Sequence, residues 1–290
     1  MEWFVFALVA AVFFGSRQVI SKKVLISEHA TEFLSVTCSL TFLFSLFFLP
    51  MMDFSYPLKI WGLMYLKALF VTIGWLLGSK ALRHLEISYV TPLTNLSPIF
   101  LIVWSVIFLG EMPSLLQYAG VAFLIFGAYW LQANHHMKNM LHPLKIFKNK
   151  YAAFMLFAIF VYSWCSVLDK VILRTVDPYT FLSFTFLVLA IHYLLIQFVK
   201  YNGLKDIKHA FVKGKHLMFV IALLLLFSDI FYYTAVALPG AMVSLIIPLK
   251  RTSTLIATLV GGRLFHEHDM IYRFIACGIM IVGVVLIVIG

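Results

Sequence analysis

Two adjacent cationic residues, Lys250 and Arg251, lie near the middle of an apolar segment at residues 240–262. A charge buried among apolar groups is costly, so it marks a functional position by default. Arg presents a planar fork to a carboxylate or phosphate, and Lys adds a compact charge. At helical spacing, Arg251 shares a face with small or polar residues, namely Ser244, Pro248, Thr254, Thr258 and Gly262. This pattern predicts that Lys250, Arg251 and Thr254 line a cavity for an anionic group.

One acidic residue, Asp229, lies at a similar depth in the segment 216–237, and Tyr232 and Tyr233 follow it on the same helical side. Three interpretations of the cation pair stay open: contact with an anionic ligand, an ion pair with Asp229, or a gating contact. For Asp229 we weigh pairing with Arg251 against carrying a coupling proton.

Other polar residues inside apolar segments are weaker candidates. Lys67 either contacts the cavity or extends its stem toward an interface, and Arg17 is close enough to a segment end to do the latter. His192 is a candidate for proton coupling, with hydrogen-bonded packing as the alternative.

The composition indicates a membrane protein. Of the 290 residues, 63% are hydrophobic and 12% charged, whereas soluble domains have about a quarter charged. The apolar segments have the length of about 20 residues that a membrane-spanning helix needs, and they lack the alternation of barrel strands. Ten such segments can be drawn: 3–22, 33–52, 58–80, 87–109, 113–132, 151–171, 179–199, 216–237, 240–262 and 269–289. The fold class we expect is an all-α membrane protein of ten transmembrane helices. We expect the first segment to be a permanent helix rather than a removed signal.

The sequence also indicates a duplication. Pro92 and Pro248, Glu111 and Glu267, and Gly127 and Gly283 are each 156 residues apart. We therefore expect two five-helix repeats, at 1–140 and 150–290. Because five is odd, the second must enter the membrane inverted, as in many secondary transporters. We expect both glutamates to be structural, each stabilising the N-terminus of the helix that follows it.

The duplication adds candidates in the first repeat. Asn95 is offset by 156 residues from Arg251, so the cavity would carry its charge on one side. Tyr89 and Trp164 are aromatic candidates for the same cavity, with ordinary packing as the alternative.

The positive charges predict an orientation, because Lys and Arg concentrate in cytoplasmic loops. Connections after even-numbered segments carry three: Lys59, Lys170 and Arg174. Those after odd-numbered segments carry fifteen: Lys22, Lys23, Lys80, Arg83, Lys138, Lys145, Lys148, Lys150, Lys200, Lys205, Lys208, Lys213, Lys215, Arg263 and Arg273. Both termini should therefore face outward across the cytoplasmic membrane. The net charge of +10 needs no nucleic acid to explain it.

These features resemble the drug/metabolite transporter superfamily, with the EamA type as the nearest match. The resemblance lies in Pro92–Asn95 through Gly110-Glu111, in Pro248–Thr252 through His266-Glu267, and in Phe14-Gly15-Ser16. It covers essentially the whole chain and implies a substrate cavity between the repeats and alternating access. A late Lys-Arg pair that serves substrate phosphate in related branches is similar to Lys250-Arg251.

We therefore expect a secondary transporter of a small polar or anionic metabolite rather than an enzyme. An ion or proton gradient, or exchange, would supply the energy, because no GxxxxGK[ST] phosphate loop is present. The alternatives are a flippase for a lipid or lipid-linked headgroup and a membrane enzyme acting on lipid. We expect no cofactor. The histidines His135, His136, His266 and His268 lack further ligands, so we expect no metal.

Overall fold

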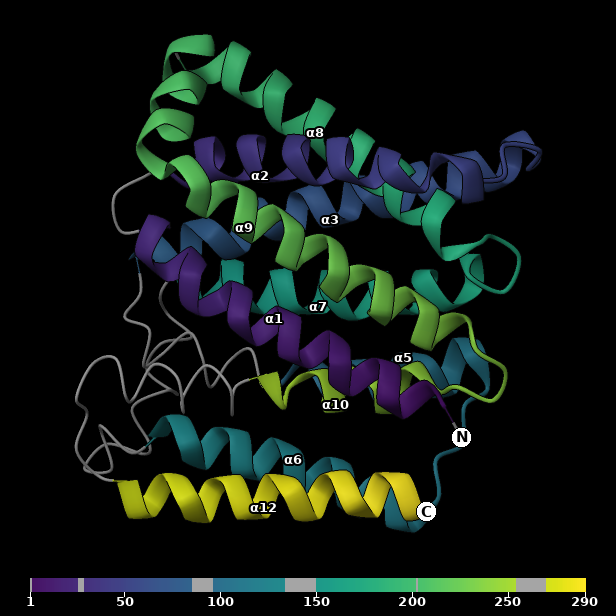
Figure 1. Ribbon diagram of the computed structural model, residues 1–290. Coiled ribbons are helices and arrows are strands. Elements are labelled where there is room, and N and C mark those ends of the chain that lie inside the picture. Colours follow the sequence, from purple (N-terminus) through teal and green to yellow (C-terminus); the bar gives the residue numbers. More distant parts are fainter. Residues whose placement is uncertain (1, 26–28, 85–95, 134–149, 202, 254–269) are drawn as a thin grey trace.

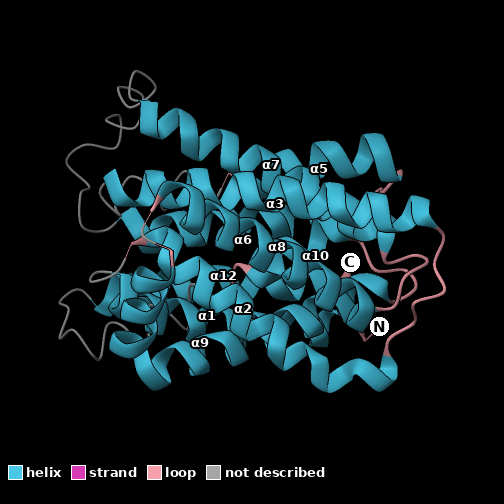
Figure 2. Cartoon of the chain, turned by 90° about the horizontal axis from the view of Figure 1, so that it is seen from above, coloured by secondary structure: helices cyan, strands magenta, loops and turns pink. Residues whose placement is uncertain are grey.

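A computed structural model describes residues 2–25, 29–84, 96–133, 150–201, 203–253 and 270–290. Within these residues the chain is helical and has no strand. The helices are α1 (Trp3–Leu25), α2 (Ala30–Ser45), η1 (Leu46–Met51), α3 (Leu58–His84), α5 (Ser97–Trp104), η2 (Ser105–Leu109), α6 (Leu115–Ala133), α7 (Lys150–Ile172), α8 (Pro178–Lys200), α9 (Leu204–Ala237), α10 (Val243–Lys250) and α12 (Met270–Ile289). Figure 2 shows the all-helical bundle.

Each predicted apolar segment contains one of these helices. Six described spans are long and apolar enough to cross a membrane, and three shorter apolar helices accompany them. One boundary prediction is wrong: residues 204–215, expected in a loop, belong to α9. Charged residues such as Lys and Glu favour a helix almost as well as Leu does, so polarity here marks only where the apolar stretch ends.

The helices pack in a pattern that pairs the two halves of the chain. Helix α1 packs along α9 while α3 packs along α7, and α2 lies against α8. Helix α5 contacts α7 as α10 contacts α1, and α6 lies beside α12 at one edge of the bundle (Figure 1). Contacts between the halves therefore build most of the core.

Helices α6 and α12 approach closely at glycines. A Cβ atom placed on Gly120 would lie 2.7 Å from the carbonyl oxygen of Gly283, and one on Gly283 would lie 2.7 Å from that of Gly120. Further along, a Cβ on Gly127 would lie 3.0 Å from the carbonyl oxygen of Ala276. Small residues let helix backbones approach in a membrane, which explains why this pair packs so tightly.

Both termini lie at one end of the bundle (Figure 1), together with the connections 52–57, 110–114, 173–177 and 238–242. Hydrogen bonds join two of these connections. The backbone N–H of Asp53 donates to Thr180 Oγ1 at 2.9 Å, and the Tyr56 hydroxyl donates to Asp177 Oδ2 at 3.2 Å. The Ser55 N–H donates to Asp53 Oδ1 and keeps the pKa of that carboxyl below its usual value. These hydrogen bonds therefore join the two halves of the chain at this end of the bundle.

The buried side chain of Glu111 caps a helix of the other half. Its carboxylate accepts hydrogen bonds from the N–H groups of Val243, at 2.8 Å, and Ser244, at 3.0 Å, and from the Ser244 hydroxyl. These N–H groups begin α10, where a negative charge is favourable. The expected structural role is therefore correct for Glu111, but the stabilised helix is α10 rather than the following helix, α6. Glu267 lies outside the described residues.

Candidate functional site

The cation pair lies where α10 ends. Lys250 is the last residue of this helix, and Arg251 is its C-cap. Pro248, inside the helix, has no N–H to donate and so weakens the last turns. Free carbonyl groups at a helix C-terminus carry partial negative charge, which favours cations beside them. The two charges therefore lie at an interruption of a helix rather than within a continuous one.

Lys250 forms an ion pair with Asp229, which was one of the interpretations of the two cations. Its Nζ lies 3.3 Å from Asp229 Oδ1, and both side chains are 14% exposed. The same Nζ lies 4.4 Å from the centre of the Tyr232 ring and 4.9 Å from that of Phe14, at cation–π distance. From the sequence we weigh Arg251 as the partner of Asp229, and the structure shows Asp229 paired with the neighbouring Lys250.

Arg251 instead reaches the other half of the chain. Its Nη2 donates to the hydroxyl of Ser97, the first residue of α5. The backbone carbonyl of Ser97 accepts from the Ser163 hydroxyl at 3.0 Å, which ties α5 to α7. The end of α10 and the start of α5 thus meet through a charged side chain.

Arg17 belongs to the same cluster. Its guanidinium lies 4.9 Å from the centre of the Phe14 ring, which Lys250 also contacts. Its buried Nε has no hydrogen-bond partner among the described residues. Arg17 therefore faces the cluster rather than only the membrane interface.

A second ion pair lies next to the first. Lys67 Nζ lies 3.1 Å from Asp169 Oδ1, with the side chains 3% and 6% exposed, and donates to the Tyr233 hydroxyl at 2.9 Å. The Tyr232 hydroxyl donates to Asp169 Oδ2 at 3.1 Å. Because Lys250 lies over the ring of Tyr232, this tyrosine links the two pairs.

Cationic side chains gather in this cluster. Among the described residues it holds Arg17, Lys67, Lys250 and Arg251, together with the carboxylates of Asp169 and Asp229. Arginine and lysine side chains can bind a carboxylate or phosphate group.

Two predicted residues lie away from the cluster. His192 Nδ1 is 2.8 Å from Thr72 Oγ1, and its ring packs edge-on against Tyr65. Trp164 packs edge-on against Trp104 and Phe108. Both contacts match the packing alternatives. Asn95, Tyr89 and Thr254, together with the histidines His135, His136, His266 and His268, lie outside the described residues.

Sequence reasoning missed Asp169 and Ser97. Asp169 lies near the end of a predicted segment, where a charge looks like an interface residue. A signal was available, because Tyr162, Ser166 and Asp169 recur at helical spacing and give α7 a polar face. Ser97 carries no charge and gave no comparable signal.

Known proteins agree with this architecture. The EamA-like transporter family model matches residues 1–132. This part of the chain is therefore similar to EamA-like transporters. The similarity agrees with the multi-pass helical architecture described above.

One curated relative and one solved structure extend the comparison. An "Uncharacterized transporter in cobO 3'region" from Sinorhizobium sp is 35% identical over 75 residues, which cover 26% of this chain and 53% of the relative. The match thus spans about half of that relative. A solved structure described as "Crystal structure of protein" has a TM-score of 0.75 at 15% identity, covering 98% of this chain and 96% of the other. This likeness shows the fold alone.

Proposed function

We propose that this protein is an EamA-type secondary-active transporter of a small anionic metabolite, which binds at the cluster around Arg251 and Lys250. The observation that carries the proposal is the convergence of cationic side chains at one place: Arg17 and Lys250 both lie at the ring of Phe14, and Arg251 directly follows Lys250. Arginine and lysine bind carboxylate and phosphate groups through charge-assisted hydrogen bonds. The buried Nε of Arg17 offers a donor to an anionic substrate.

The proposal includes two inverted repeats, at 1–140 and 150–290, that move against each other. The reciprocal packing supports this: α1 on α9 repeats α3 on α7, and α5 on α7 repeats α10 on α1. In the α6–α12 contact, Gly120 meets Gly283 and Gly127 meets Ala276. Adding 156 to 120 and 127 gives 276 and 283, so each pair maps onto the other. A two-fold axis requires this reciprocity.

The site suits alternating access because its two faces come from different halves of the chain. Arg251 is the C-cap of α10 in the second half, and Ser97 begins α5 in the first. Movement of the halves would separate these two residues and change the groups offered to substrate. Asp229 is the candidate for proton coupling, since a proton on it would release Lys250. The proposed setting is the cytoplasmic membrane, with both termini outside.

The test uses purified protein in proteoliposomes. A thermal-shift panel of small carboxylates, amino acids and phosphate esters first selects a compound that stabilises the protein, and counterflow then measures its transport. Arg251→Ala should reduce both stabilisation and counterflow at least tenfold, because it removes a charged hydrogen-bond donor. Arg174→Ala, which changes an exposed arginine, is the matched control.

Two results would contradict the proposal. One is unchanged affinity and counterflow in Arg251→Ala. The other is an equal loss in Arg174→Ala, because a general effect of charge would then explain the result.

A further inference from the structure

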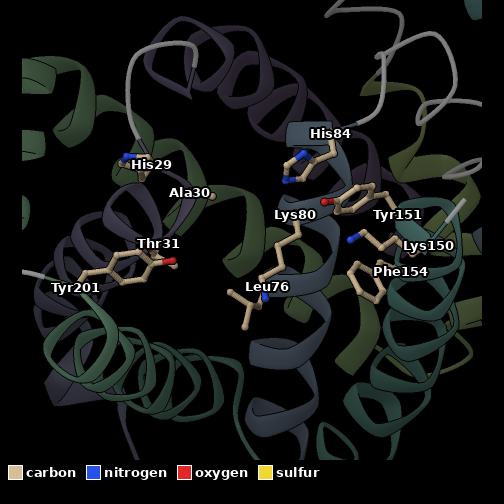
Figure 3. Close-up of a pocket in the computed structure, with 10 residues that line it drawn as sticks. All are labelled: His29, Ala30, Thr31, Leu76, Lys80, His84, Lys150, Tyr151, Phe154 and Tyr201. Atoms are coloured by element: carbon tan, nitrogen blue, oxygen red, sulfur yellow. The ribbon is translucent and has the colours of Figure 1, made fainter.

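A pocket opens at the end of the bundle opposite the termini. Its volume is about 330 Å³, within the range of small-ligand sites. Four elements line it: the end of α3, the start of α7, the start of α2 and the residue that follows α8. Lys80, His84, Lys150 and Tyr151 lie on one wall, and His29 and Tyr201 lie on the other (Figure 3).

Two lysines, Lys80 and Lys150, are among the described residues that line this pocket, and two histidines add donors. No Asp or Glu occurs among these described lining residues. Glu32, the acidic residue of the first turn of α2, is buried and does not line the pocket. Basic pockets between membrane helices are typical binding sites for phosphate-bearing headgroups.

Aromatic packing holds part of this wall in place. The ring of His84 stacks on that of Tyr151, with centroids 4.1 Å apart and planes 17° from parallel. The Nζ of Lys150 lies 5.0 Å from the centre of the same Tyr151 ring. Three of the polar groups therefore come from a packed assembly of α3 and α7 rather than from independent surface side chains.

A helix N-terminus adds to the positive potential. Lys150 is the first residue of α7, whose first turn has no acidic residue, so a cation lies where the helix dipole opposes it. An anion in the pocket would be favourable to this helix end and to both lysines.

We propose that this pocket binds a phosphate-type anion, separately from the cluster around Arg251. The proposal does not depend on the proposed transport function. Two sources share this chemistry: a free phosphate group and the phosphodiester of an anionic lipid headgroup. A phosphate group would accept from Lys80, Lys150 and the histidines, while the apolar walls formed by Leu76 and Phe154 leave room for carbon atoms attached to it.

The experiment places the full chain in nanodiscs of phosphatidylcholine and measures thermal stability. In the first arm inorganic phosphate is titrated at constant ionic strength against chloride. In the second arm phosphatidylglycerol replaces part of the neutral lipid. The variant is Lys80→Gln/Lys150→Gln. Its charge-matched control is Lys59→Gln/Arg174→Gln, at exposed positions of the opposite end.

Wild type and the control should be stabilised in at least one arm, and the arm that responds identifies the source. The pocket variant should lose that response, with apparent affinity at least about tenfold weaker, because each exposed charge contact contributes up to about fivefold. Arg251→Ala should keep the response. The proposal is overturned if neither anion stabilises wild type more than chloride or neutral lipid does, or if the pocket and control variants respond alike.

Discussion

Lys67 and Asp169 form an ion pair that joins the two halves of the chain at the most buried point of the charged cluster. Their Nζ and Oδ1 atoms lie 3.1 Å apart, and neither side chain is more than 6% exposed. Tyr233 accepts a hydrogen bond from the lysine and Tyr232 donates one to the carboxylate. The Lys250–Asp229 pair is more accessible, because each of its side chains is 14% exposed. We therefore assign a mainly structural role to the inner pair and substrate contact to the outer one.

The inner pair predicts a specific pattern of stability. Lys67→Met should cost about 3–5 kcal/mol, because it leaves the Asp169 carboxylate buried without its counter-charge. The double variant Lys67→Met/Asp169→Leu should recover much of that loss, because it removes both charges. Thermal and denaturant unfolding in detergent would measure the difference. Lys59→Met, on the exposed start of α3, is the control. A Lys67→Met protein as stable as wild type would show that the pair is not a structural requirement.

The contact between α6 and α12 predicts an asymmetry between two glycines of one helix. Gly283→Ala places a Cβ 2.7 Å from a backbone carbonyl and should cost about 1–3 kcal/mol, the usual range for overpacking. Gly278→Ala meets nothing within 4 Å and should stabilise the helix by up to about 1 kcal/mol, because Ala is a better helix former than Gly. Unfolding temperatures of the two variants test this directly. Equal losses at the two positions would mean that the close approach at Gly283 is not what makes a side chain costly there.

The cap on α10 predicts a graded series at Glu111. Glu111→Ala leaves the N–H groups of Val243 and Ser244 without their acceptor and should cost about 1–3 kcal/mol. Glu111→Gln keeps one acceptor oxygen and should cost less. Glu2→Ala, at an exposed glutamate, is the control. The measurement is thermal stability, with hydrogen exchange of the first turn of α10 as a local probe. Unchanged exchange in Glu111→Ala would exclude the cap.

The positions of the helices could be predicted because the length of each apolar stretch can be counted directly in the sequence. The exception, residues 204–215, shows the limit of that signal: polar residues end an apolar stretch without ending a helix. The repeat could be found because the spacing of Pro92 and Pro248 matches that of Glu111 and Glu267. Sequence patterns of this kind report on one helix at a time.

The contacts between site residues were harder to predict than which residues belong to the site. Lys250, Arg251, Asp229 and Tyr232 were identified from their depth, and they do lie in one region. Which cation meets which acid depends on the packing between helices, so the pairing of Asp229 with Lys250 could not be derived. The cap of α10 by Glu111 was not predicted for the same reason, because it joins a residue of the first half to a helix of the second half.

The hydrogen-bonded connections at the end of the bundle that holds the termini predict that a cross-link there blocks transport. Asp53 N and Thr180 Oγ1 are 2.9 Å apart, so Asp53→Cys/Thr180→Cys places two thiols close together on opposite halves. If the halves separate here during transport, oxidative cross-linking should reduce counterflow at least tenfold and leave thermal-shift binding of the substrate intact, with recovery on reduction. Asp53→Cys alone is the control, and the native cysteines Cys38, Cys165 and Cys277 are buried. Full counterflow in the cross-linked protein would mean that this end stays closed throughout the cycle.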